Sequence, residues 1–244
     1  MSNKYFLLLL GVMLCLGCSK DNSGPDLVSA GTNGLGGSLA RFAIIGDYLY
    51  TVSNQDITVI DVSDANHPVK KKAYPLGFDI ETIFPKGDKL FIGTETGMKI
   101  MDASNPEIPV PISNYSHIRS CDPVVANDNY AYVTLRSDNR CTRGTNELQV
   151  IDIKNLQNPL QVNSYPMIRP MGLAIDGNKL FVCDQGIKYY DIEGDKIILK
   201  KTYGGEAHDI ILNNGLLMAI GSDGLTQYDY NTDELKFLSR IPVL

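Results

Sequence analysis

The chain has 244 residues and a formal net charge of −6, and 43% of its residues are hydrophobic. This length fits one large all-β domain or two smaller domains, and the apolar content is enough to form a packed core. The acidic balance argues against nucleic acid as a partner, because phosphate binding needs a basic surface.

The first residues, 1–17, are typical of an export signal and not of a folded domain. Lys4 precedes an apolar run, Tyr5–Leu16, that is too short to cross a membrane as a helix. The run ends in Leu-Gly-Cys, which resembles the lipobox of bacterial lipoproteins, although Cys15 stands where that motif usually has leucine. We expect signal cleavage before Cys18 and lipidation of its thiol. The alternative is a plain signal peptide with a chance cysteine.

The following segment, 18–37, is rich in Gly, Ser, Asn and Asp and shows no periodic apolar pattern, which predicts a flexible tether. Residues 19–21, Ser-Lys-Asp, resemble the export tag of some surface-exposed lipoproteins. The sequence therefore predicts an outer-membrane lipoprotein, facing the periplasm or exposed at the cell surface. Its first partner would be the membrane, reached through the lipid anchor.

From residue 38 onward, one phrase returns at intervals of about forty residues. It ends each time in an aspartate, at Asp61, Asp102, Asp152, Asp191 and Asp229. Each interval also holds three further runs rich in β-branched and aromatic residues. In the first interval all four runs are 42–45, 48–52, 57–61 and 69–76. Tight Gly, Asp and Asn turns join the first two runs of each interval, as expected for hairpins.

Four short antiparallel strands in each repeat are the signature of a β-propeller blade. We therefore predict an all-β fold, a five-bladed β-propeller of four-stranded antiparallel blades. A parallel β-helix is the alternative. We also expect the ring to close by packing of the first blade on the last, unless 26–30 supplies a strand to a shared closing blade. The predicted propeller is 38–244, with blades of approximately 38–77, 78–119, 120–169, 170–206 and 207–244.

The recurring aspartate is expected to accept hydrogen bonds from main-chain N–H groups two or three residues further on, at the bend between strands three and four. The phrases VIDVSDANHP, IMDASNPEIP and VIDIKNLQNP resemble the LVIVD repeat. The resemblance covers about 38–244 and is clearest in the first three blades. It implies a β-propeller and a secreted or surface protein of bacteria. It implies no established reaction, and it supplies no catalytic residue.

Two cysteines of the third blade are disulfide candidates. Its longer repeat places Cys141 in an insertion between strands two and three, on the same face as the start of strand one, where Cys121 lies. An exported compartment permits the bond, and two free thiols are the alternative. Cys183 lies within a strand and is expected to be a small buried hydrophobe.

Acidic residues near the starts of the innermost strands are the candidate binding site. They would surround the mouth of the central channel, and converging carboxylates there could bind a cation or act on a sugar. Local hydrogen bonds to loop amides are the alternative. The candidates are Asp79, Glu81, Asp122, His208 and Asp209. No zinc spacing, phosphate loop or calcium loop occurs, so neither a metal nor another cofactor is expected.

The absence of a recognisable catalytic motif leads us to expect that the chain is not an enzyme. The first hypothesis is a non-catalytic, lipid-anchored scaffold that binds an envelope protein or a glycan through the channel mouth. The alternative is a carbohydrate-active hydrolase or lyase that uses Asp79, Asp122 and Asp209. A purely structural envelope component is a third reading that the sequence does not separate from the first.

Overall fold

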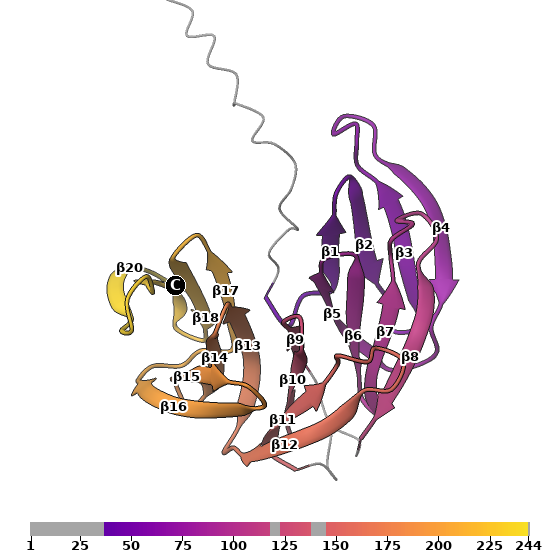
Figure 1. Ribbon diagram of the computed structural model, residues 1–244. Coiled ribbons are helices and arrows are strands. Elements are labelled where there is room, and N and C mark those ends of the chain that lie inside the picture. The colour runs from indigo at the N-terminus through magenta and orange to yellow at the C-terminus, as the bar shows by residue number, and fades with distance from the viewer. Residues whose placement is uncertain (1–36, 118–122, 138–144, 244) are drawn as a thin grey trace, which may run out of the picture. The chain divides into compact units, whose positions relative to one another are not determined.

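The computed structural model describes residues 37–117, 123–137 and 145–243. These residues form five antiparallel sheets of four strands, and each sheet is built from four consecutive strands (Figure 1). The predicted class is confirmed: the chain is all-β, with five four-stranded blades in a propeller arrangement. No helix occurs in the described ranges, and none of their segments could therefore cross a bilayer as a helix.

The strands follow the expected order within each blade. Blade 1 consists of β1 (Phe42–Ile45), β2 (Tyr48–Val52), β3 (Asp56–Asp61) and β4 (Val69–Pro75). Blade 2 consists of β5 (Ile80–Lys86), β6 (Lys89–Thr94), β7 (Gly97–Asp102) and β8 (Val110–Ser116). Blade 3 consists of β9 (Val124–Ala126), β10 (Tyr130–Leu135), β11 (Glu147–Asp152) and β12 (Leu160–Pro166). Blade 4 consists of β13 (Pro170–Asp176), β14 (Lys179–Asp184), β15 (Ile187–Glu193) and β16 (Lys196–Tyr203). Blade 5 consists of β17 (Asp209–Asn213), β18 (Leu216–Gly221), β19 (Gly224–Asp229) and β20 (Lys236–Pro242).

The recurring aspartate stabilises the bend after the third strand of a blade. The Asp61 carboxylate accepts a hydrogen bond from the Ser63 N–H at 3.0 Å. Equivalent bonds of 2.8–2.9 Å reach Asp102, Asp152 and Asp229 from the residue two positions on. Hydrogen bonds from the Ser63 hydroxyl and N–H lower the pKa of Asp61 to about 2. The predicted turn role is thus confirmed in four of the five blades.

The hydrophobic core consists of four clusters, and each fills the space between two successive blades. A strand of an inner blade contributes to two clusters because its side chains alternate between the two faces of the sheet. Leu90 and Ile92 of β6 pack against blade 1, whereas Phe91 packs against blade 3. Blades 2, 3 and 4 are therefore covered on both faces, which explains their nearly continuous apolar strands.

Blades 1 and 5 each have one face that no described blade covers. The free face of blade 1 includes Phe42, which is 52% exposed, and the free face of blade 5 includes Ile220 and Ile241, which are 44% and 63% exposed. Between the first and last blades, no pair of strands in the described ranges packs extensively. The expected ring closure by packing of blade 1 on blade 5 is therefore wrong.

The described link from the start of blade 1 to blade 5 is a short segment, 37–39, and not a sheet face. The Ser38 hydroxyl donates to the Asp209 carboxylate at 3.2 Å, and the Leu39 N–H donates to the same group at 3.3 Å. The Leu173 N–H of blade 4 donates to the Ser38 hydroxyl at 2.7 Å. Hydrogen bonds of this short segment, and not apolar packing of sheet faces, therefore connect the start of blade 1 to blades 4 and 5.

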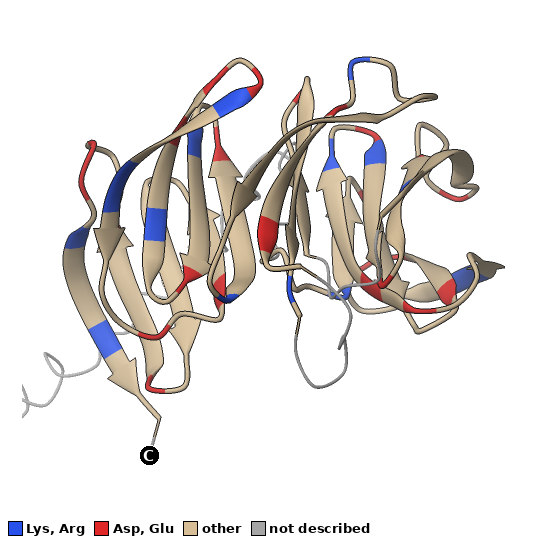
Figure 2. Ribbon diagram, turned by 90° about the horizontal axis from the view of Figure 1, so that it is seen from below, with Lys and Arg blue, Asp and Glu red and all other residues tan. Residues whose placement is uncertain are grey.

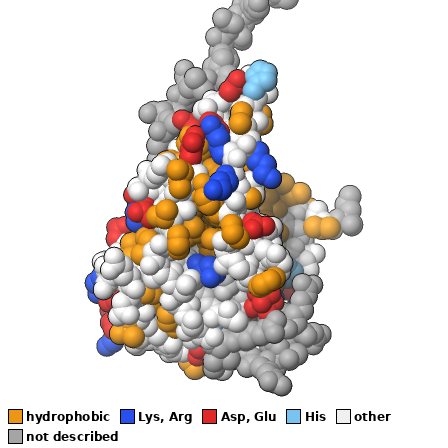
Figure 3. Space-filling model, turned by 90° about the vertical axis from the view of Figure 1, so that its right-hand side faces the viewer, with side chains coloured by type: hydrophobic (Ala, Val, Ile, Leu, Met, Phe, Trp, Pro, Cys, Tyr) orange, Lys and Arg blue, Asp and Glu red, His pale blue; other side chains and the backbone are white. Residues whose placement is uncertain are grey.

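Charged side chains lie mainly near strand ends, in loops and along outer strands (Figure 2). The outer strands are exposed along most of their length, and Val69 and Val110, which begin β4 and β8, are 51% and 48% exposed. On the side where these two strands lie, hydrophobic side chains gather with lysine side chains among them (Figure 3). Apolar side chains on the surface are ordinary in a folded protein, and these lie among charged ones.

Candidate functional site

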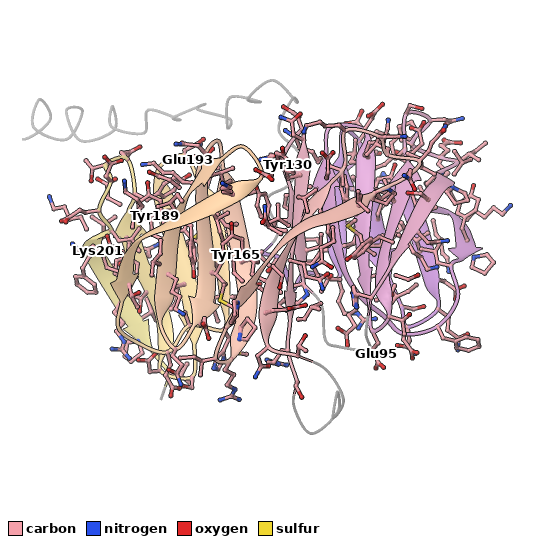
Figure 4. All side chains as sticks on the ribbon, turned by 60° about the horizontal axis from the view of Figure 1, so that its bottom comes forward. Glu95, Tyr130, Tyr165, Tyr189, Glu193 and Lys201 are labelled. Atoms are coloured by element: carbon pink, nitrogen blue, oxygen red, sulfur yellow. The ribbon has the colours of Figure 1, made fainter. Side chains whose placement is uncertain are left out.

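The propeller has two ends with different loops. The innermost strands start at one end, where the connections between strands two and three also lie. Figure 4 shows Glu95, from the β6–β7 connection, at this end, and Tyr130 and Glu193 at the opposite end. We call the first the channel end, because residues that begin four innermost strands converge there.

A pocket of about 540 Å³ opens at the channel end. This central pocket collects side chains from four blades, and its volume lies within the usual range of small-molecule sites. The described residues that line it are Leu39, Arg41, Asn54, Ile80, Glu81, Thr82, Glu95, Pro123, Arg136, Pro170 and Met171. Two carboxylates and two guanidinium groups in one pocket make it a polar site with charges of both signs.

Main-chain carbonyl groups on two blades orient Arg41. Its Nε donates to the Val52 carbonyl oxygen at 3.4 Å, and one of its terminal nitrogens donates to the Ile80 carbonyl oxygen at 3.2 Å. Arg41 is nonetheless an exposed residue. Within the described ranges, no carboxylate forms an ion pair with its guanidinium group. The pocket therefore holds a guanidinium group that main-chain carbonyl groups orient and that forms no ion pair in those ranges.

The structure divides the predicted channel-mouth residues among several places. Glu81 lines the central pocket, as proposed for it. Asp79 does not belong to that lining; its backbone has a φ of 64°, and its carbonyl oxygen accepts a 3.0 Å hydrogen bond from the Glu95 N–H. Asp122 lies outside the described residues. Asp79 and Asp209, which the sequence grouped with Asp122 as one catalytic set, therefore do not line the central pocket together.

Asp209 lies beneath the N-terminal segment and holds it in place. Besides the Ser38 and Leu39 donors, its carboxylate accepts the Ile210 N–H at 3.0 Å. A Cβ atom at Gly37 or Gly172 would lie only 2.1–2.2 Å from a carboxylate oxygen of Asp209, so both positions need glycine. Burial raises the pKa of Asp209 to about 6, although these hydrogen bonds act in the opposite direction. Asp209 is therefore tied to its own surroundings, which was the alternative to a ligand role.

His208 lines a different pocket of about 350 Å³, beside blades 4 and 5. Arg169, Gln185 and Glu206 also line this side pocket. Glu206 accepts a hydrogen bond from the Ser222 hydroxyl group. Across the described ranges, no group of three or more His, Cys, Asp or Glu side chains is placed to hold a metal ion.

The sequence-based candidates did not include three charged residues of this lining, Arg41, Glu95 and Arg136. The missing signal was topological. Glu95 and Arg136 follow the second strands of blades 2 and 3, and in a propeller those connections share an end with the starts of the innermost strands. The same relation predicts that Cys141 lies near Cys121, and it applies equally to Glu95 and Arg136.

The cysteine predictions have separate outcomes. Cys183 is fully buried between blades 4 and 5, and burial raises its pKa well above the usual value, so it is the inert core thiol that was expected. Cys18, the predicted lipidation site, lies outside the described residues, and so do Cys121 and Cys141. Lipidation and the disulfide remain predictions.

Two segments of the sequence, 36–75 and 118–166, match the LVIVD repeat. The resemblance noted from the repeated phrases is thereby confirmed, in the first and third blades. No protein of curated function matches the chain in sequence.

Several solved structures share the fold. One is a protein from Lactobacillus plantarum, with a TM-score of 0.65 and 12% identity over 81% of this chain and 69% of that chain. Another is a periplasmic gluconolactonase from Pseudomonas aeruginosa, with a TM-score of 0.61 and 13% identity over 81% of this chain and 68% of that one. A third, from Bacteroides uniformis, is named as a candidate 6-phosphogluconolactonase; its TM-score is 0.62 and its identity 12%, over 83% and 70% of the two chains.

The expectation that this chain is not an enzyme is wrong. It rested on the lack of a recognisable catalytic motif, yet structures with the same fold are named as lactonases. The likeness at this level of identity concerns the fold, and the named reactions belong to those proteins.

Proposed function

Because the chain carries LVIVD repeats on a five-bladed β-propeller, we propose that it is a lipid-anchored envelope protein that binds a small, hydroxyl-rich ligand of the carbohydrate class in its central pocket. The observation that carries the proposal is the pocket of about 540 Å³ at the channel end, with charged and amide groups from different blades. A rigid scaffold that presents convergent polar groups in one concave site is the usual arrangement for ligand binding.

The composition of the pocket favours a polar ligand. Hydrogen-bond donors and acceptors come from Arg41, Asn54, Thr82 and the two glutamates. Apolar surface comes from Ile80 and Met171. A sugar presents the matching combination of hydroxyl groups and C–H faces. A long peptide or a flat protein surface would contact the outer loops and leave the pocket unfilled.

The envelope address rests on the leader sequence. The apolar run before Cys18 supports export and lipidation, and 18–37 would serve as the tether. Cys18→Ser should move the protein from the membrane fraction to the soluble fraction and abolish incorporation of labelled palmitate. Unchanged labelling in that variant would refute the lipid anchor and leave the binding proposal intact.

Binding is tested on the soluble chain that starts after Cys18. Titration calorimetry against a panel of monosaccharides, sugar acids and sugar lactones should identify at least one ligand. Glu95→Gln should weaken its binding by about tenfold, because a charged hydrogen bond is lost. Glu193→Gln makes the same change at the opposite end of the propeller and should leave binding unchanged (Figure 4). Equal effects of the two variants would refute the central pocket as the site.

Hydrolysis of a sugar lactone is the second candidate function. The observation that favours it is that Glu81 and Glu95 share the pocket with Arg41. A carboxylate would take a proton from water as the water oxygen attacks the lactone carbonyl, and the guanidinium group would stabilise the oxyanion. The ring oxygen then leaves and is protonated, which gives the hydroxy acid. The names of two neighbours make lactones the first substrates to try.

The assay follows proton release from glucono-1,5-lactone above the spontaneous rate. Glu81→Gln and Glu95→Gln should each lower kcat by at least about a hundredfold if the altered residue is the base. A rate that equals the spontaneous reaction at every protein concentration would refute hydrolysis of this lactone.

A further inference from the structure

The central pocket contains an anion-binding position, and this inference rests on the pocket's role as a ligand site. Arg41 uses two of its five N–H donors on the carbonyl oxygens of Val52 and Ile80. These bonds join blades 1 and 2 and fix the plane of the guanidinium group. The remaining donors are available on a residue that is exposed and that lines the pocket.

Arg41 forms no ion pair with a carboxylate in the described ranges. By comparison, Lys71 contacts Asp61 and Glu107 at 3.1 Å, and Lys188 contacts the buried Asp184 at 2.6 Å. Arg41 instead bonds only neutral carbonyl groups of the protein. A planar guanidinium group that is oriented but lacks an anion matches a carboxylate or phosphate oxygen pair.

The rest of the lining limits the charge of the ligand. Glu81, Glu95 and Arg136 line the same pocket, so its described lining holds two negative and two positive side chains and has no net charge to offset a second negative charge on the ligand. A carboxylate carries one negative charge, whereas a phosphate monoester carries nearly two at neutral pH. A lining without net charge therefore favours the carboxylate, which brings one negative charge, over the phosphate monoester.

From these contacts we infer that the central pocket takes a monoanionic sugar acid, and that Arg41 binds its carboxylate. The hydroxyl groups of the acid would lie toward Glu81 and Glu95. Such a molecule is also what remains when water opens a sugar lactone, so the same position would hold the product of that reaction.

The test compares three related ligands that carry different charges. Calorimetry on the wild-type chain from residue 19 onward uses gluconate, its neutral amide gluconamide, and 6-phosphogluconate. Gluconate should bind at least tenfold more tightly than gluconamide, and this preference should decline as salt is added. It should also bind more tightly than 6-phosphogluconate.

Variants then assign the preference to one side chain. Arg41→Gln should reduce gluconate binding at least tenfold and leave gluconamide binding within about twofold. Arg41→Lys should give an intermediate loss, because it keeps the charge and loses the planar fork. Arg169→Gln, in the side pocket, is the matched control and should change neither ligand.

The outcomes separate this inference from the proposed function. Equal binding of gluconate and gluconamide to the wild type overturns the anion position and leaves sugar binding standing, and it does so without relying on the folding of any variant. Tighter binding of 6-phosphogluconate overturns the limit to one charge. Binding of none of the three, together with none of the sugar panel, overturns both.

Discussion

Replacing Asp209 with asparagine should change the free energy of unfolding, relative to wild type, more favourably at neutral pH than in mild acid. The Asp209 carboxyl group is held against Gly37 and Gly172, and it accepts hydrogen bonds from Ser38 and Leu39. Burial raises its pKa from the usual 3.8 to about 6. Asparagine has nearly the same shape and does not ionise in this range. Its amide oxygen can accept the Ser38 and Ile210 bonds, whereas the bond from the Leu39 N–H to the second oxygen is lost at every pH.

The sign of the effect follows from proton binding. Between about pH 4 and pH 6, native Asp209 holds a proton that the unfolded chain has already released. The free energy of unfolding therefore falls as the pH rises through this window. Below pH 4 the group has no such effect, and above pH 6 the buried carboxylate lowers stability by its full amount. A shift of about two pH units corresponds to about 3 kcal/mol.

The measurement is urea denaturation of the chain from residue 19 onward, at four values between pH 4 and pH 7. The free energy of unfolding of Asp209→Asn, minus that of wild type, should rise by about 3 kcal/mol from pH 4 to pH 7. Asp102→Asn is the control whose difference from wild type should stay nearly constant over this range, because hydrogen bonds from Ser104 lower the pKa of Asp102 and its pH-dependent effect therefore lies below pH 4. A difference for Asp209→Asn that is flat across the range would refute the buried, raised-pKa carboxyl group.

Three further predictions concern the core and its edges. Asp184→Ala should cost about 3 kcal/mol of unfolding free energy, because the fully buried carboxylate accepts two main-chain N–H groups and the ammonium group of Lys188; a loss under 1 kcal/mol would contradict this. Gly172→Ala should lower the thermal midpoint by several degrees, since its Cβ would lie 2.2 Å from a carboxylate oxygen, whereas Gly204→Ala meets nothing within 4 Å and should change it little. The Cys183 thiol should react with a maleimide only after unfolding, as peptide mapping would show; labelling of the native protein would refute its burial.

The fold could be predicted because each repeat contains the strand patterns and turn residues that specify its own blade. Gly46, Gly87 and Gly177 have positive φ angles in the turns between strands one and two, as the turn residues indicated. Alternation and turn chemistry need no information from distant parts of the chain. Which faces remain uncovered could not be predicted in the same way. Ile211 and Met218 of blade 5 are as apolar as residues that inner blades bury, and only the neighbouring blade decides their exposure.

Only part of the candidate site could be predicted from the sequence. Glu81 could be placed because its position follows from the start of one strand. The position of Asp209 depends on Gly37, which lies more than 170 residues earlier, and a carboxyl group expected in an open mouth is instead covered by that segment. Pairings at such a separation leave no local pattern in the chain. The role of Arg41 depends likewise on a carbonyl group in the next blade.

The uncovered sheet of blade 1 has a consequence for how the pocket is reached. In an array whose stability is a sum over nearest neighbours, a terminal unit is held by one interface and opens before the interior units. Amide protons of β2 and β3 should therefore exchange faster than those of β6 and β7, whose blade is clamped from both sides. Arg41 belongs to that terminal unit, so transient loosening of blade 1 would admit or release a ligand while blades 2 to 4 stay folded.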